Sequence, residues 1–203
     1  MNIIVVDWDD TCLPSTWLHG RSATTTCSST YQRQIIQLFR VARQLADQVV
    51  IITNAEQGWV ERSSERHLPK VREYLIRHNI KIISARSQYE KYVNTTFGHC
   101  SNNSMLWKQF AFTSLIDQAP ENTYQIFSIG DGHDERAAVF SLESLAQVAA
   151  SKSIKLIDSP TLDLLSVQIQ QIIENLPALF NQRCRLDLMM TNTSLDEKEA
   201  CCP

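Results

Sequence analysis

Three acidic residues lie close together near the start of the chain. Asp7, Asp9 and Asp10 follow residues 3–6, a run of four β-branched residues that predicts a strand buried on both faces. Carboxylates crowded at the end of such a strand repel one another and lose hydration, so they require a cation beside them. Mg²⁺ suits this role because it binds carboxylate and carbonyl oxygens and keeps positions open for water and a phosphate. One Asp could then attack phosphorus, and the Asp two residues later could protonate the leaving oxygen.

A second acidic group lies in the C-terminal half of the chain, at the end of another predicted strand, residues 124–129. Asp131 stands between two glycines, and Asp134 and Glu135 come shortly after it. Glycines on both sides of an acid at a strand end let the backbone turn sharply and approach a ligand closely. The glycines therefore indicate that a ligand could lie close to Asp131.

Two further side chains could contact a phosphate. Residues 48–53 predict another buried strand, which ends in the hydroxyl of Thr53 and is followed by Asn54. A neutral hydroxyl can donate to a phosphate oxygen that faces away from a metal. Lys108 lies in a predicted helix, and an ammonium can offset repulsion among carboxylates. Lys91 is the alternative lysine.

The order of these four groups resembles the haloacid dehalogenase (HAD) superfamily of aspartyl-phosphate phosphatases. The first motif of that family is an apolar strand that ends in Asp-x-Asp-x-Thr, as residues 7–11 do. The other motifs are a strand closing on Ser or Thr, a lysine early in a helix, and Gly-Asp-Gly-x-x-acid. They are matched in order by Thr53, Lys108 and Asp131, so the resemblance covers essentially the whole chain.

The resemblance implies catalytic roles for four residues. Asp7 would become phosphorylated, and Asp9 would act first as an acid and then as a base. Thr53 would contact the phosphate, and Lys108 would pair with both the phosphate and Asp7. An acid two residues after the nucleophile, as at Asp9, is typical of the phosphatases and phosphotransferases of the family.

The resemblance also implies a Mg²⁺ site. The ion would be held by the Asp7 carboxylate, the Asp9 backbone carbonyl and Asp131, with Asp134 and Glu135 in support. The family more often has Asn and then Asp at the last two positions. Which of those two acids contacts the metal shell therefore stays open.

Three residues are candidates for substrate binding: Thr11, Asn54 and Trp17. Residues 12–30 are polar and predict a loop, and HAD proteins carry a helical turn and a β-flap at this place. Trp17 could meet the substrate from that flap. Both Trp17 and Trp59 could lie near the mouth of the site and stack on a phosphotyrosine ring. The alternative is that Trp17 packs on the body of the domain.

Composition limits the classes of partner. The formal net charge of -3 gives no broad positive field, so we expect no nucleic-acid binding. No apolar stretch is long enough to span a bilayer, and the chain starts with a strand where a signal peptide would stand. We therefore expect no membrane span and cytoplasmic synthesis. The six cysteines have neither zinc-site spacing nor the density of a disulfide scaffold, so we expect reduced thiols.

Alternating strands and helices predict a three-layer, Rossmann-like α/β fold with a central parallel sheet of about five strands. Residues 1–185 would form this domain, residues 84–103 would be an irregular segment, and residues 186–203 a polar C-terminal tail. In such sheets ligands bind beyond the carboxyl ends of the strands. The intervals between the motifs leave no room for a cap domain, which needs more than ~50 residues.

These features predict a Mg²⁺-dependent phosphomonoester hydrolase that acts through an aspartyl-phosphate. An uncapped site suits a phosphate carried by a bulky partner, so a phosphorylated protein is the expected substrate. The resemblance favours phosphotyrosine, because capless relatives include protein tyrosine phosphatases, among them bacterial effectors delivered into host cells. The alternatives are a sugar or nucleotide phosphatase and an inactive phosphate-binding module. We expect a monomer.

Overall fold

A single seven-stranded sheet forms the middle layer of the molecule, with the strand order β3-β2-β1-β4-β5-β6-β7. The computed structural model describes the chain except for residues 23–24, 99–102, 117–118, 192–194 and 198–203. The strands are β1 (Asn2–Val6), β2 (Gln48–Thr53), β3 (Lys81–Ser84), β4 (Tyr124–Gly130), β5 (Val148–Lys155), β6 (Leu186–Met190) and β7 (Leu195–Glu197). Strands β1 to β6 are parallel, and β7 pairs antiparallel with β6.

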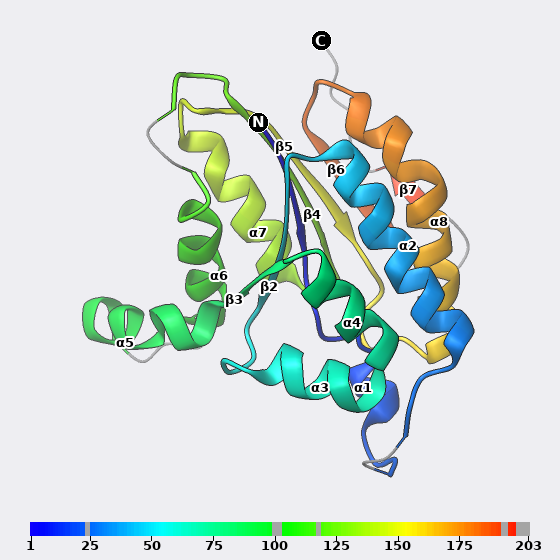
Figure 1. The fold of residues 1–203 in the computed structure, drawn as a ribbon. Helices are drawn as coiled ribbons and strands as arrows, with labels where there is room; N and C mark the ends of the chain where they lie inside the picture. The colour runs from blue at the N-terminus through cyan, green and yellow to red at the C-terminus, as the bar shows by residue number, and fades with distance from the viewer. Residues whose placement is uncertain (23–24, 99–102, 117–118, 192–194, 198–203) are drawn as a thin grey trace.

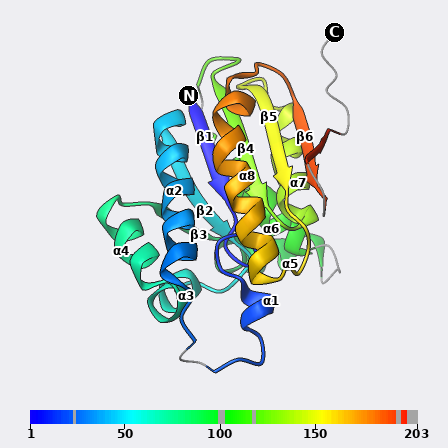
Figure 2. The ribbon, with the colours of Figure 1, turned by 90° about the vertical axis from the view of Figure 1, so that its right-hand side faces the viewer.

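Helices cover both faces of the sheet, which confirms the predicted three-layer α/β fold (Figures 1 and 2). They are α1 (Ser15–Leu18), α2 (Ser29–Leu45), α3 (Trp59–His67), α4 (Pro69–Arg77), α5 (Ala85–Phe97), α6 (Asn103–Thr113), α7 (His133–Ser141), the 3₁₀ turn η1 (Leu142–Ser144) and α8 (Leu162–Asn181). Helices α2, α4 and α8 lie on one face and α6 and α7 on the other. Among the described residues, no helix combines the length and apolar character that crossing a bilayer requires.

The side chains of β1 divide between two hydrophobic cores. Ile4 and Val6 pack in the core under α2 and α8, whereas Ile3 and Val5 pack in the core under α6 and α7. All four side chains are essentially inaccessible to solvent. Both faces of the strand are therefore buried, which explains the continuous run of β-branched residues.

The register of the sheet fixes the level at which the central strands end. Val6 pairs with Ile51 of β2 on one side and with Ile129 of β4 on the other. The residues that follow these positions therefore emerge at the same edge of the sheet. Asp7 begins there, and its backbone N–H still donates to the Ile129 carbonyl, at 2.9 Å.

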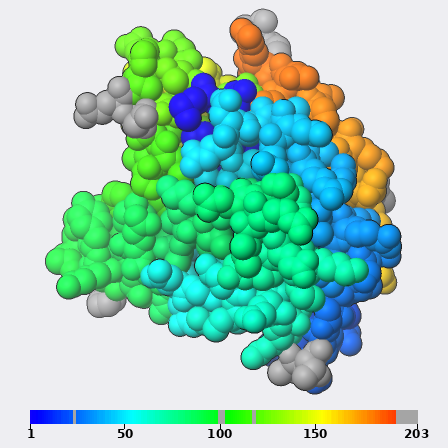
Figure 3. Space-filling view, in the orientation of Figure 1, coloured from blue at the N-terminus to red at the C-terminus, as the bar shows by residue number. Residues whose placement is uncertain are grey.

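The predicted irregular segment at residues 84–103 is wrong where it overlaps α5. Ser84 begins this helix because its side chain accepts a hydrogen bond from the Ser87 N–H. Only Ala85 and Val93 are buried along α5, so the sequence carries little apolar periodicity. The helix forms the protrusion at the left of Figures 1 and 3.

The predicted boundary at residue 185 is also wrong, because residues 186–190 form β6. Leu186, Leu188 and Met190 are buried, and β6 pairs with β5 through Lys152 to Lys155. Part of the predicted tail, residues 192–194 and 198–203, lies outside the described residues. The sheet therefore extends beyond the predicted domain.

The apolar pattern of the sequence predicts a strand only at residues 154–157, whereas β5 begins at Val148 and ends at Lys155. The sequence also predicts that the preceding helix extends through residues 136–147, whereas α7 ends at Ser141. Three consecutive buried residues of β5 are polar: Ser151, Lys152 and Ser153. A strand with polar residues at its centre gives no apolar pattern to recognise.

Lys152 reaches the C-terminal end of α8. Its ammonium donates to the carbonyls of Leu179 and Phe180, at 3.0 and 2.7 Å, and to that of Gln182. These carbonyls lie where a helix has no intrahelical donors left, so the lysine caps α8 from the sheet. Burial lowers the pKa of Lys152 to about 8.

We predict that Lys152 makes folding more favourable as the pH rises. Above about pH 8 the folded chain has released this proton, whereas the unfolded chain keeps it until about pH 10. The free energy of unfolding of the native chain should therefore rise relative to Lys152→Met between those values, by about 2–3 kcal/mol. Urea unfolding of both proteins at several pH values measures this difference, and a difference that falls with pH would refute the prediction.

Candidate functional site

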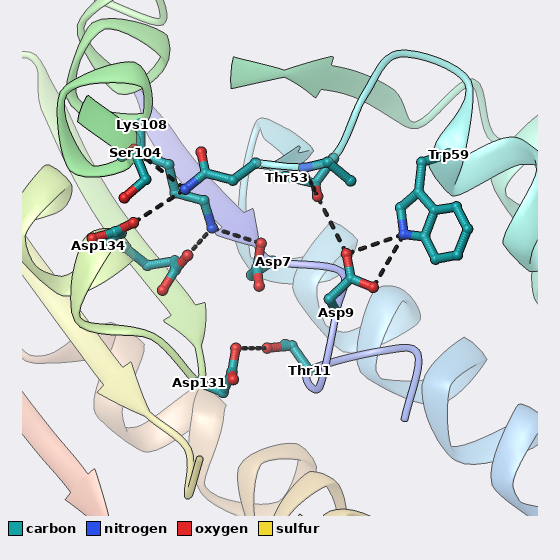
Figure 4. Close-up of polar contacts among 12 residues, drawn as sticks. Asp7, Asp9, Thr11, Thr53, Trp59, Ser104, Lys108, Asp131 and Asp134 are labelled. Atoms are coloured by element: carbon teal, nitrogen blue, oxygen red, sulfur yellow. Dashed lines mark hydrogen bonds and ion pairs between the residues drawn. The ribbon is translucent and has the colours of Figure 1, made fainter. Parts of the chain in front are cut away.

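A buried lysine lies between two carboxylates at the carboxyl edge of the sheet. Lys108 of α6 donates to Asp7 Oδ1 at 2.7 Å and also forms an ion pair with Glu135 of α7. All three residues are at least nine-tenths buried. In contrast, Lys91 is exposed on α5. Lys108 is thus the lysine that the fold directs at Asp7 (Figure 4).

The two glycines beside Asp131 make room for Glu135. A Cβ at Gly130 would lie 2.7 Å from Cγ of Glu135, and one at Gly132 would collide with its Oε2. Glu135 Oε2 has no hydrogen-bond partner in the described structure, although it is buried. Because Gly130 and Gly132 have no side chains, Glu135 in the first turn of α7 can reach Lys108 and pair with it.

Asp9 lies beside Asp7 and contacts two other segments. The indole N–H of Trp59 donates to both carboxylate oxygens, at 3.1 Å each, and the Thr53 hydroxyl lies 3.5 Å from Oδ2. Burial and the charge of Asp7 raise the pKa of Asp9 to about 6, although the Trp59 hydrogen bond acts against this shift. This environment suits a carboxyl group that both donates and accepts a proton.

Asp131 faces the same space from the end of β4. Burial and the charges of Asp7 and Asp10 raise its pKa to about 7, while Lys108 acts in the opposite direction. The Thr11 hydroxyl lies 3.5 Å from Asp131 Oδ1 and is fully buried. Thr11, expected to bind substrate, therefore contacts a predicted metal ligand.

Asn54 connects α6 with the start of α7. Its side-chain N–H₂ donates to Asp134 Oδ2 at 3.1 Å and to the Ser104 carbonyl at 3.2 Å. Asp134 and Glu135 thus have different partners, since Glu135 pairs with Lys108. Asn54, also expected to bind substrate, therefore links helix α6 to helix α7.

Sequence reasoning assigned no role to Asp10. Its carboxylate accepts a hydrogen bond from the Thr16 N–H at 2.8 Å and another from the Thr16 hydroxyl. It therefore binds the first turn of the short helix α1. The neighbouring prediction of a β-flap is wrong for the described part of residues 12–30, which contains α1 and turns.

The two tryptophans considered for substrate stacking lie in different surroundings. Trp17 is partly buried against the hydrophobic core, and the Arg21 guanidinium lies 4.1 Å from its ring centre. This matches the alternative in which Trp17 packs on the domain. Trp59 instead contacts Asp9, a role that its position at the start of the helix after β2 did not reveal.

The oxygen donors at this edge suit Mg²⁺. Among the described residues, no three His, Cys, Asp or Glu side chains are grouped as metal ligands. The expected set, however, has only two carboxylates, from Asp7 and Asp131, and its third donor is the Asp9 carbonyl. Mg²⁺ fits such a set because it retains several waters. Burial and the charges of Asp7 and Asp10 disfavour the ionised form of Asp131, and a divalent cation beside it would favour that form.

Comparison of the chain with protein-family models, with curated proteins and with solved structures gave no match.

We predict that a side chain at position 130 destabilises the fold because it would collide with Glu135. Gly130→Ala should lower the free energy of unfolding by about 1–3 kcal/mol, since the added methyl group overpacks a buried position. In a Glu135→Ala background the same change should cost less than about 1 kcal/mol. Chemical denaturation of the four proteins gives the coupling, and equal costs in both backgrounds would contradict the prediction.

Proposed function

We propose that this chain is a Mg²⁺-dependent phosphomonoester hydrolase of the HAD type. The observation that carries the proposal is the buried contact between Lys108 and Asp7, with Asp9 and Asp131 beside it. These residues come from three separate parts of the chain: Asp7 and Asp9 follow β1, Asp131 follows β4, and Lys108 lies on α6. A nucleophile, an acid, a cation and a metal ligand are thereby available to one phosphate.

In the first step, a carboxylate oxygen of Asp7 attacks phosphorus. A bond forms between this oxygen and phosphorus while the bond to the leaving oxygen breaks. Asp9 gives its proton to the leaving oxygen, and Thr53 donates a hydrogen bond to a phosphoryl oxygen. Lys108 orients Asp7 through their 2.7 Å contact and offsets the charge of the phosphate.

In the second step, Asp9 removes a proton from water as the water oxygen attacks phosphorus. The bond between phosphorus and Asp7 breaks, which releases inorganic phosphate and restores both carboxyl groups. Bound Mg²⁺ would supply positive charge to the phosphoryl oxygens. Asp7, Asp131 and the Asp9 carbonyl would hold the ion.

We also propose a phosphorylated protein as the substrate, with phosphotyrosine favoured. The support is the absence of an inserted domain over the site in the described part of the chain. Between β1 and β2 lie only α1 and α2, and β3 between α4 and α5 belongs to the main sheet. A phosphate on a large partner could therefore approach the carboxyl edge.

We predict that Asp7→Asn abolishes turnover of p-nitrophenyl phosphate in the presence of Mg²⁺. Loss of the nucleophile should reduce kcat by at least about 10³-fold. The matched control is Asp10→Asn, which makes the same chemical change in the neighbouring acid that caps α1. This control should stay within about fivefold of the native rate, because the amide oxygen still accepts from the Thr16 N–H and the amide NH₂ can donate to the Thr16 hydroxyl oxygen. Equal and negligible rates for the native chain and Asp7→Asn would instead support an inactive phosphate-binding module.

Removing the metal gives an independent prediction. Chelation with EDTA should suppress hydrolysis of phosphotyrosine peptides, and added Mg²⁺ should restore it, because uncompensated carboxylates repel the phosphate. A panel of phosphopeptides, sugar phosphates and nucleotides is assayed under the same two conditions. Undiminished turnover in EDTA would contradict the role of Mg²⁺, and a preference for sugar phosphates would contradict the protein substrate.

A further inference from the structure

A pocket of about 310 Å³ lies between α1 and Trp59, the residue that donates to the Asp9 carboxylate. Leu13, Leu18 and Trp59 supply apolar walls, and the exposed residues His19 and Arg21 also line it. None of the residues that take part in the two proposed reaction steps lines this pocket. Its surface is suited to a ligand with a flat or apolar body.

Three residues that line the pocket also contact Asp9. Trp59 donates its indole N–H to both carboxylate oxygens at 3.1 Å. The Ser15 side chain interacts with the same carboxylate, and the backbone of Leu13 forms a bridge with that of Asp9. The pocket and the surroundings of Asp9 thus share three residues.

The contacts between the pocket residues and Asp9 bear on where the leaving group of the substrate lies. An acid that protonates the leaving oxygen must lie within hydrogen-bond distance of it. The group attached to that oxygen extends away from phosphorus and so occupies space beside the acid. Leu13, Ser15 and Trp59 border both Asp9 and the pocket.

We propose that this pocket binds the leaving group of the phosphomonoester and selects an apolar one. We also propose Trp59 as a positioning residue, because its ring lines the pocket and its indole N–H holds the Asp9 carboxylate in place. The inference rests on the proposed phosphatase function and adds to it the substrate class.

A second pocket offers the contrasting prediction. It has a volume of about 370 Å³, touches Thr53 and is lined by the charged residues Glu56, Glu61 and Lys81. A hydrophilic leaving group, such as a polyol, would be suited to that surface. Only one of its lining residues, Thr53, approaches the Asp9 carboxylate, at 3.5 Å, so the pocket of Trp59 is favoured.

The first test compares benzyl phosphate with glycerol phosphate, whose leaving groups are both alkyl alcohols. In the native chain, kcat/KM for benzyl phosphate should exceed that for glycerol phosphate by about tenfold or more. Leu18→Gln should raise KM for benzyl phosphate by about tenfold and leave KM for glycerol phosphate unchanged. The matched control is Val167→Gln, which makes an apolar residue polar at an exposed position on α8 and should change neither value.

The second test isolates the hydrogen bond from Trp59. Trp59→Phe keeps an aromatic wall but removes the N–H, so KM for benzyl phosphate should stay within about threefold. The fall in kcat should be larger for phenyl phosphate than for p-nitrophenyl phosphate, because the poorer leaving group depends more on the acid. A loss of folding alone would reduce both rates by the same factor.

The outcomes separate the two proposals. If the native chain hydrolyses none of these esters, the phosphatase function itself fails. If it hydrolyses glycerol phosphate as efficiently as benzyl phosphate, or if Leu18→Gln leaves both KM values unchanged, only the leaving-group pocket is overturned. An equal fall in kcat for both aryl phosphates in Trp59→Phe would overturn the positioning role.

Discussion

The buried ammonium of Lys108 is the interaction on which the rest of the site depends. It lies between Asp7 and Glu135, and all three residues are at least nine-tenths buried. Removing one member of such a set leaves an unpaired buried charge, which typically costs about 3–5 kcal/mol. The carboxyl end of β1, the helix α6 and the first turn of α7 are therefore held in one arrangement.

One ammonium does not neutralise the acids around it. Lys108 has direct contacts with Asp7 and Glu135, whereas Asp9 and Asp131 rely mainly on neutral donors from Trp59 and Thr11. Burial raises the pKa values of Asp9 and Asp131, and the charge of Asp7 adds to both shifts. In the proposed function, bound Mg²⁺ would supply the positive charge that an anionic phosphate needs beside these carboxylates.

The sequence predicted the parts of the fold that have strong apolar patterns. Strand β1 was recognisable because Ile3–Val6 bury alternate side chains in two cores, and the ends of β2 and β4 followed from the same pattern. In contrast, β5 was misplaced because Lys152 is buried at its centre, where it caps α8. Helix α5 was missed because it buries only two residues.

Within the site, the resemblance identified the pair of Lys108 and Asp7 but not the partners of the other acids. Asp134 and Glu135 are adjacent in sequence, yet one contacts Asn54 and the other Lys108. Trp59 reaches Asp9 from 50 residues away, and only the packing of α3 against the sheet determines this contact. Side-chain pairs of this kind depend on tertiary distances, which no local pattern encodes.

The most direct test of the account is to identify the phosphorylated atom. The chain is mixed with p-nitrophenyl phosphate and Mg²⁺, quenched in acid within the first turnover and analysed by peptide mass spectrometry. The account predicts one phosphoryl group on Asp7, removed by hydroxylamine as expected of an acyl phosphate. A phosphoryl group on any other residue, or turnover with an unmodified Asp7 throughout, would contradict it.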